Sequence, residues 1–439
     1  MPGLYLEVNY KPEMVKKVLI LFVVLILALP TIQWNFHPIS SLELKGYFLP
    51  SEIAKFSAEN WFDGIYQQQL SKNIEDSVGF RSDFVRLYTQ LDFSLFGLSH
   101  ANSIGIGKSH YLFYLEGIDN YTGKNRLPPG FIEARVKQYR KLQTYLLEKY
   151  GIHFLLIITP DKAQFYPEYI PDRFLRNSKG PVNYSSYIRE LDKTGAQYID
   201  FNQYFLAMKD TSSLELYPKN GSHWSSLGAL YAFDSLSRYL AQKHGINIPV
   251  RVVDTILITN ELRGNDGDLS RTMNLIWEPP HPAMSYADYH FSEPEGTVKP
   301  RALFVGDSFY WQWKDPFVID NTFEAPYFWY YSTTLYPDSR KIYTSTFDLD
   351  FREHVLNQEI IILIQSMAGS CHLGYGFLER ACAELFYPEM IAEYEDVIRT
   401  NPEWLKNIEE KAKSLGEPVA RVIYREAVYF VNRKVENQK

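Results

Sequence analysis

The stretch RALFVGDSF, at residues 301–309, decides the fold. After Arg301, its residues 302–305 (ALFV) form a short apolar run, which predicts a strand over 301–305 that is buried on both faces. Gly306, Asp307 and Ser308 follow where this strand ends and a helix should begin. Ligands of open α/β sheets bind beyond the carboxyl ends of the strands. The turn after this strand is therefore a candidate functional site.

The same pattern recurs on both sides of this stretch. Further apolar runs predict buried strands at 153–159 (HFLLIIT), 197–201 and 359–365 (EIIILIQ). Between them, helical periodicity predicts helices at 135–150, 184–193 and 225–243. Continuous apolar strands that alternate with helices predict a mostly parallel sheet covered on both faces. We therefore expect a three-layer α/β domain.

The rest of the chain divides around this domain. We expect a cytoplasmic tail with a membrane anchor or signal at 1–35, a connector with a helical entry segment at 36–100, the α/β domain at 101–385 and a helical appendage at 386–439. Inside the α/β domain, glycines punctuate the stretch 103–117 and predict a short hairpin. We interpret 251–298 as an irregular insertion or a long loop.

An uninterrupted apolar run, VLILFVVLILAL at 18–29, is either the core of a signal peptide or a short membrane anchor. Lys16 and Lys17 precede it. The nearest small-residue sequence, Ala28-Leu29-Pro30, is a poor signal-peptidase site because of its proline. We favour an uncleaved anchor for this reason. Positive charge on its N-terminal side predicts that the N-terminus lies in the cytoplasm and that the chain after residue 35 lies outside it.

Composition excludes several classes of protein. The 439 residues are 46% hydrophobic and 22% charged, which excludes a disordered chain or a coiled coil. A net charge of −7 gives no reason to expect a nucleic-acid partner. Two cysteines and ten scattered histidines show no metal-ligand spacing, so we expect neither a metal nor a cofactor. The 16% of aromatic residues either fill a core or stack on sugars.

Cys371 and Cys382 are either bridged or two free buried thiols. On one straight helix they would lie about 16 Å apart, because each residue adds about 1.5 Å. A disulfide needs Cα atoms within about 7 Å. A bridge therefore requires Cys371 to lie in the loop after the strand at 359–365.

Ser308 is the first residue that could carry chemistry. A serine at the end of a buried strand lies next to backbone N–H groups, which suits a nucleophile with an oxyanion donor. Gly306 would give the backbone room for a sharp turn there. The alternative is that Asp307 or Ser308 merely caps a helix. A similar pattern, Gly-Asp-Leu-Ser at 267–270, follows no strand and shows how weak a short pattern is.

Two further strand ends carry polar side chains. His223, in the stretch NGSHW just before the helix at 225–243, is a candidate general base or a packed histidine. Asp161 and Lys162 follow the strand at 153–159, where they either contact substrate or, for Asp161, cap a helix. The sequence by itself does not bring His223 and Ser308 together.

These motifs together resemble a known family. GDSF at 306–309, His223-Trp224, PDK at 160–162 and a helical segment ending in Gly-Phe-Arg at 79–81 are similar to the SGNH-hydrolase-like proteins related to alginate O-acetyltransferases. In that circularly permuted family the His motif precedes the Ser motif, as it does here. The resemblance covers roughly residues 60–385. It implies Ser308 as nucleophile, His223 as its base, and Asp161, Lys162 and Trp224 as substrate-binding residues.

The chain departs from the family at one position. The family has an Asp two residues before the His, and this chain has Gly221 there. Loss of the Asp from a Ser-His-Asp triad can lower kcat by about 10⁴. Three explanations stay open. Another carboxylate, for example Asp161, Asp200 or Asp210, replaces the missing one, a Ser–His dyad is sufficient, or the protein is a catalytically silent carbohydrate-binding or scaffold protein.

The resemblance implies O-acetylation of an exported or cell-surface polysaccharide through an acyl-enzyme. It also implies a membrane-bound O-acyltransferase as the partner that supplies the acyl group. A polysaccharide O-acetyl esterase would use the same residues, with water in place of the sugar hydroxyl. Gly221 favours the silent binding protein, whereas Ser308 and His223 favour the two enzymes.

Overall fold

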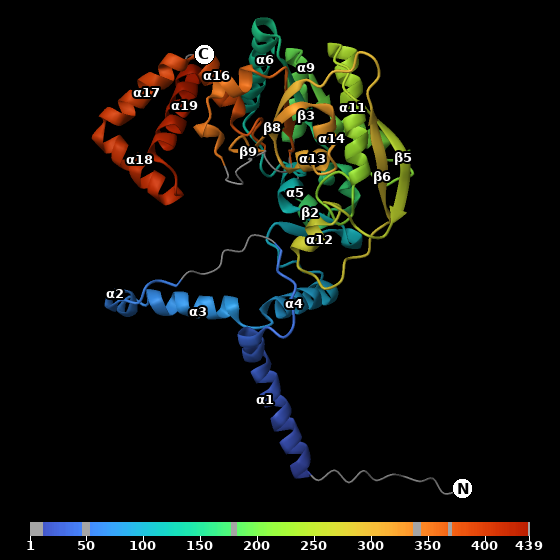
Figure 1. Cartoon of the computed structure of the whole chain (residues 1–439), viewed down its shortest axis with the longest axis vertical. Coiled ribbons are helices and arrows are strands. Elements are labelled where there is room, and N and C mark those ends of the chain that lie inside the picture. Colours follow the sequence, from blue (N-terminus) through green and yellow to red (C-terminus); the bar gives the residue numbers. More distant parts are fainter. Residues whose placement is uncertain (1–11, 46–52, 177–181, 337–343, 368–370, 438–439) are drawn as a thin grey trace. The chain divides into compact units, whose positions relative to one another are not determined.

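The computed structural model describes residues 12–45, 53–176, 182–336, 344–367 and 371–437 (Figure 1). The chain forms two compact units. The first contains Met1–Asn102 and Ser270–Pro279, and the second contains Ser103–Leu269 and Pro280–Lys439. The second unit holds the sheet that the sequence predicts.

A six-stranded sheet of order β4-β3-β10-β7-β8-β9 forms the centre of the second unit (Figure 1). Its strands are β3 (His153–Ile158), β4 (Tyr198–Asp200), β7 (Arg301–Gly306), β8 (Glu324–Tyr330), β9 (Thr334–Tyr336) and β10 (Ile360–Gln365). All neighbouring pairs from β4 to β8 are parallel, and β9 pairs antiparallel with β8. The predicted α/β fold with a mostly parallel sheet is confirmed.

Side chains from the central strands alternate between two hydrophobic clusters, one on each face of the sheet. Leu155 and Ile157 of β3 enter one cluster, and Leu156 and Ile158 enter the other. The first face is covered by α10 (Phe201–Met208), α11 (Ser226–His244) and α14 (Val318–Thr322). The second is covered by α6 (Pro129–Tyr150), α9 (Asn183–Thr194), α15 (Phe351–Leu356) and α16 (Phe377–Phe386). Burial on both faces explains why these strands read as continuous apolar runs.

The structure corrects the prediction of an irregular stretch at 251–298. Two long strands, β5 (Val250–Thr259) and β6 (Met284–Ser292), pair there as an antiparallel ribbon. Most residues of β5 are exposed, and the pairing register shifts between Val253 and Thr255. The ribbon therefore lacks both the continuous apolar run and the strict alternation by which a strand is predicted. The predicted hairpin is confirmed as β1 (Ile104–Ile106) and β2 (Leu112–Tyr114).

Three helices follow the α/β layers at the C-terminus, as predicted. They are α17 (Pro388–Thr400), α18 (Pro402–Leu415) and α19 (Val419–Asn437), and they share a hydrophobic cluster of their own. Polar contacts connect α19 to the domain: Arg380 of α16 donates to the Tyr424 hydroxyl at 2.9 Å, and Arg135 of α6 pairs with Glu436 at 3.0 Å. The C-terminal helices thus pack on α6 and α16.

The first unit begins with the apolar helix α1 (Pro12–Phe36). Among the residues that the structure describes, this is the one helix long and apolar enough to cross a membrane. Its central side chains are exposed, as a lipid-facing helix requires. The helix suggests a signal anchor or a membrane anchor.

Three more helices complete this unit: α2 (Ala58–Phe62), α3 (Ile65–Ser77) and α4 (Arg81–Phe96). Gly79, from the Gly-Phe-Arg motif, packs directly on α1, because a Cβ at Gly79 would lie 2.2 Å from the carbonyl oxygen of Pro30. The segment Ser270–Pro279 joins the unit through Gln90 of α4, whose side-chain oxygen accepts from the backbone N–H groups of Ile276 and Trp277.

Candidate active site

Ser308 lies at the carboxyl end of β7, as the sequence predicts. It begins the short helix η3 (Ser308–Tyr310), which continues into α13 (Trp311–Lys314). The cap of this turn is Asp307, whose carboxylate accepts from the backbone N–H of Phe309 at 3.1 Å. Since Asp307 caps the helix, the Ser308 hydroxyl is available for another contact.

Gly306 has a different role from the one expected. A Cβ at this position would lie 2.6 Å from the carbonyl oxygen of Ile364 on β10. Gly306 does not adopt a positive φ, so the turn itself does not require a glycine. The glycine is needed for the close approach of β7 to β10 just before the nucleophile position.

His223 lies on the loop that precedes α11, where Ser225 caps the helix by accepting from the Gly228 N–H. Its Nε2 lies 2.7 Å from the Ser308 Oγ. Its Nδ1 lies 2.9 Å from a carboxylate oxygen of Asp268. The fold therefore brings a serine, a histidine and an aspartate into hydrogen-bonding contact in the order of a Ser-His-Asp triad.

Asp268 is the residue that sequence reasoning missed. It comes from the Gly-Asp-Leu-Ser pattern at 267–270, which follows no strand. Two hydrogen bonds from Ser222, one from its backbone N–H at 2.7 Å and one from its hydroxyl at 2.5 Å, fix the carboxylate beside His223. The one signal was a second Gly-Asp pair close to a serine, besides the pair that precedes Ser308, but nothing in the sequence shows that this segment reaches the histidine.

None of the three carboxylates considered from the sequence lies in this position. Asp161 caps the short helix α7 (Lys162–Phe165), and Asp200 caps α10 and accepts from the Tyr184 hydroxyl. Asp210 is exposed just after α10. Another carboxylate does take the place of the family Asp, as one of the three explanations expected, but it is Asp268, next to the Nδ1 of His223, and none of the three residues named.

Gly221 and Asp268 are structurally linked. A Cβ at Gly221 would lie 2.7 Å from the carbonyl oxygen of Asn265 and 2.8 Å from that of Asp266. Any side chain at position 221 would therefore push away the loop that carries Asp268. The glycine that removes the family carboxylate is also the residue that makes room for its replacement.

The hydrogen bonds around Asp268 favour its charged form. Burial opposes ionisation, but hydrogen bonds from His223 and Ser222 outweigh it and hold the pKa of Asp268 below its usual value. An ionised Asp268 accepts from the Nδ1–H of His223, which leaves Nε2 as the acceptor for the Ser308 hydroxyl. This proton assignment follows from the hydrogen-bond network.

Lys162 supports the loop that carries His223. Its Nζ donates to the carbonyl oxygens of Gly221 at 2.6 Å and Lys219 at 2.7 Å. Burial lowers the pKa of this lysine well below its ordinary value, although the charge of Asp268 partly opposes the shift. Lys162 thus has a positioning role in this structure, and substrate contact by Lys162 or Asp161 stays a prediction.

Trp224 is fully buried. Its indole lies 5.3 Å from the ring of Phe309 and 5.2 Å from that of Trp313. Phe309 in turn lies edge-on to the His223 imidazole at 4.7 Å. The tryptophan therefore holds the aromatic packing behind the histidine and serine, and a contact between Trp224 and substrate would require the ring to leave this cluster.

Tyrosines lie beside the nucleophile turn. The Tyr375 hydroxyl donates to Asp307 at 2.6 Å, and the Tyr375 ring lies 5.3 Å from that of Tyr331. Burial raises the pKa of Asp307, and the hydrogen bond from Tyr375 partly opposes the shift. Tyr331 is partly exposed and has a positive φ, as does Tyr375. Such backbone strain is often found at functional sites.

The two cysteines are both buried and are not joined by a disulfide. Cys371 does lie outside α16, whereas Cys382 lies within it. The Cys371 sulfur contacts the side-chain oxygen of Asn120 at 3.6 Å. Of the two alternatives, the structure therefore shows two buried cysteines without a disulfide.

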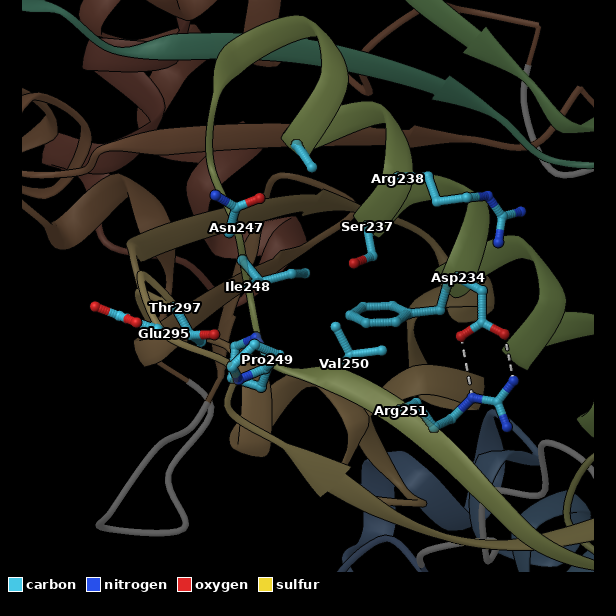
Figure 2. A pocket seen from close by; sticks show the side chains of 13 residues that line it. Asp234, Ser237, Arg238, Asn247, Ile248, Pro249, Val250, Arg251, Glu295 and Thr297 are labelled. Atoms are coloured by element: carbon cyan, nitrogen blue, oxygen red, sulfur yellow. Dashed lines mark hydrogen bonds and ion pairs between the residues drawn. The ribbon is translucent and has the colours of Figure 1, made fainter.

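A separate cavity of about 460 Å³ lies between α11 and the start of β5 (Figure 2). Figure 2 shows the paired side chains of Asp234 and Arg251 at its edge, with Ser237 and Asn247 among the polar residues of its walls. None of the three triad residues lines this cavity. It is therefore distinct from the triad site.

Asp266 provides a stability prediction because it anchors the loop that carries Asp268. Its carboxylate accepts from the backbone N–H of Ser226 at 3.0 Å, and burial raises its pKa from 3.8 to about 6. Because the pKa is higher in the folded state, Asp266 stabilises the fold below pH 3.8, and this contribution is lost as the pH rises through about 6.

We expect Asp266→Asn to remove this pH dependence, because Asn keeps an acceptor and never ionises. Between pH 4 and 8, the wild type should lose roughly 2–3 kcal/mol of unfolding free energy relative to the variant. Urea titrations of both proteins across that pH range measure the difference. A difference that stays constant with pH would contradict the prediction.

The α/β domain with its Ser-His-Asp arrangement is typical of serine-dependent hydrolases and acyltransferases. Residues 104–312 match the family model described as SGNH hydrolase-like domain, acetyltransferase AlgX. This region is therefore similar to the SGNH hydrolase-like family related to alginate O-acetyltransferases, in agreement with the sequence motifs.

One curated protein is also similar to this chain. The chain is 26% identical over 186 residues to the probable alginate O-acetylase AlgJ of Pseudomonas aeruginosa strain PAO1, a match that covers 42% of this chain and 44% of that protein. The chain thus spans less than half of that relative's length.

Solved structures of two such proteins are also similar. The O-acetyltransferase domain of Pseudomonas putida AlgJ aligns with a TM-score of 0.38 and 16% identity, over 61% of this chain and 91% of that one. Pseudomonas aeruginosa AlgX aligns with a TM-score of 0.40 and 14% identity, over 64% and 68%. Both scores are too low to assign a function.

Proposed function

We propose that this protein is an O-acyltransferase, most simply an O-acetyltransferase, that acts on an exported or cell-surface polysaccharide. The observation that carries the proposal is the continuous hydrogen-bonded line from Asp268 through His223 to Ser308, at 2.9 and 2.7 Å. The match of residues 104–312 to an acetyltransferase family model and the similarity to a probable alginate O-acetylase support acetyl transfer to a polysaccharide as the reaction.

In the first half of the reaction, the Ser308 Oγ attacks the carbonyl carbon of an acyl donor while the Nε2 of His223 accepts the hydroxyl proton. The donor's leaving group then departs with that proton, which leaves an acyl ester on Ser308. Asp268 stays ionised throughout and stabilises the imidazolium that forms transiently. The backbone N–H of Ser308 is our candidate donor to the oxyanion.

In the second half, a sugar hydroxyl attacks the acyl-serine. His223 accepts the hydroxyl proton through Nε2 and returns it to the Ser308 Oγ as the ester bond to the enzyme breaks. The products are the O-acylated sugar and the original serine. A water molecule in place of the sugar would give hydrolysis, so access to the acyl-enzyme decides between transferase and esterase.

The hypothesis of a catalytically silent binding protein loses its main argument. It was favoured by the absence of a carboxylate at position 221, and Asp268 supplies a carboxylate to the same nitrogen of His223. A silent protein also gives no reason for the two hydrogen bonds by which Ser222 fixes Asp268. We therefore favour an enzyme.

The apolar helix α1 supports a membrane-anchored protein with its bulk in the periplasm. A membrane-bound O-acyltransferase that delivers acyl groups to Ser308 would fit that location. A reporter fused at Lys439 tests the topology, because it should be active only when it is exported. Activity of a cytoplasmic reporter would contradict the anchor orientation and the exported substrate together.

The proposed reaction is tested with an activated acetyl ester and oligosaccharides. The full chain should release the leaving group slowly in water, and added acceptor should accelerate release while acetylated sugar accumulates. Equal rates with and without every acceptor, together with free acetate as the only product, would indicate an esterase instead.

A further inference from the structure

A second cavity, of about 300 Å³, is lined by the segments that carry the triad. One wall consists of Arg263, Gly264 and Asn265, which lie three to five residues before Asp268. Another contains Trp311 and Gln312 of α13, three and four residues after Ser308. A ligand in this cavity would therefore contact the segments that hold two of the three triad residues.

The third wall comes from the ribbon that the sequence did not predict. Strand β6 contributes Tyr286 and Tyr289 to the lining, which also contains the partly exposed Trp311. A cavity of this size with several aromatic rings suits a compact ligand that has one apolar face and polar edges. A pyranose ring has this character, because its C–H groups form the apolar face and its hydroxyls form the edges.

Gln312 adds unused hydrogen-bonding capacity. The side chain is 7% exposed, and its oxygen accepts from the Asn265 amide at 3.3 Å. Its nitrogen has no hydrogen-bond partner among the residues that the structure describes. Turning the amide over would exchange the two atoms and still leave one of them unpaired. A buried amide without a partner is unfavourable, and a ligand hydroxyl would satisfy it once the side chain turns its nitrogen toward the cavity, because that nitrogen is enclosed in this structure.

The charges at the cavity select against acidic sugars. Its charged lining residues are Arg263, Asp288 and Asp315. The guanidinium of Arg263 lies over the ring of Tyr286 at 5.1 Å. Two carboxylates and one guanidinium leave a net negative site, which would repel the carboxylate of a uronate ring.

We propose that this cavity is an acceptor subsite that binds one sugar ring without a carboxylate, a neutral hexose or an N-acetylhexosamine, beside the chain segments that carry the triad residues. The inference rests on the proposed function, since it names the sugar that receives the acyl group. It also predicts that the polysaccharide is not a polyuronate such as the alginate in the name of the relative.

The test is binding of the detergent-solubilised full chain to immobilised oligosaccharides of three kinds: neutral hexoses, N-acetylhexosamines and uronates. We expect binding to one of the first two kinds and at least tenfold weaker binding to uronates. Trp311→Ala and Gln312→Met should each weaken that binding at least tenfold. Tyr429→Ala is the matched control, because Tyr429 is an exposed aromatic residue on α19 and should leave binding unchanged.

Thermal melting of each variant establishes that it is folded. If Trp311→Ala fails to fold, the sugar binding of Gln312→Met alone tests the proposed subsite. The proposal is overturned by binding to none of the non-acidic sugars, by preferred binding to uronates, or by wild-type affinity in the folded variants. Acetyl labelling of wild-type Ser308 is measured separately. Labelling without sugar binding refutes the subsite alone, and sugar binding without labelling refutes the proposed chemistry.

Discussion

Ser308→Ala is expected to abolish covalent acetylation of the protein. Wild type incubated with an activated acetyl ester should gain the mass of one acetyl group, and the variant should gain none. Because the Oγ of Ser308 is the atom that His223 contacts at 2.7 Å, its loss removes the nucleophile itself. We expect ester turnover to fall at least about 10⁴-fold.

The matched control is Ser185→Ala, which removes an exposed serine hydroxyl from α9 and should keep wild-type labelling. His223→Ala should resemble Ser308→Ala, because residues that act as one catalytic unit are not additive. A wild-type protein that never gains the acetyl mass, or a Ser308→Ala variant that gains it on another residue at the same rate, would refute the assignment.

Asp268→Asn is expected to lower kcat by about 10³–10⁴-fold while leaving the fold intact. An asparagine keeps the shape of the side chain, but its amide does not fix the histidine tautomer or stabilise an imidazolium. Steady-state kinetics with a small acetyl ester measure the loss. The result would distinguish a triad from the Ser–His dyad that the sequence left open.

Asp210→Asn is the control for Asp268→Asn, since Asp210 is exposed and was a carboxylate considered from the sequence. It should behave as wild type. If Asp268→Asn kept wild-type kcat, the hydrogen bond at 2.9 Å between Asp268 and His223 would be structural only, and a dyad would be the better description.

The sequence predicted the parts of this fold whose signal is local. Strand β10 is buried along its whole length, and all of its residues except the last are apolar. Its ends were therefore predicted within one residue. Ser308 follows a clear strand and His223 precedes a clear helix, so each could be singled out as a candidate, but the sequence did not show that the two side chains meet. The ribbon β5–β6 could not, because its exposed strands need no apolar run.

Asp268 was beyond sequence reasoning for a different reason. It lies 45 residues from His223 in the chain, in a loop whose path depends on contacts such as that of Asp266 with Ser226. Carboxylates are common, and no local pattern tells which one reaches an imidazole. Substrate contacts could not be predicted from the sequence for the same reason. Only the structure shows that Trp224 is enclosed by other rings.

The closeness of Gly221 to the 265–266 backbone has a consequence for how this site could have arisen. An ancestor with the usual aspartate could not gain the present loop before losing that side chain, because the two would collide. If the aspartate were lost first, the enzyme would be slow until a second change placed the Asp268 loop beside the histidine. Replacement of the acid therefore requires at least two coupled changes, and homologues should carry either the aspartate before the histidine or the glycine together with the distant Gly-Asp loop.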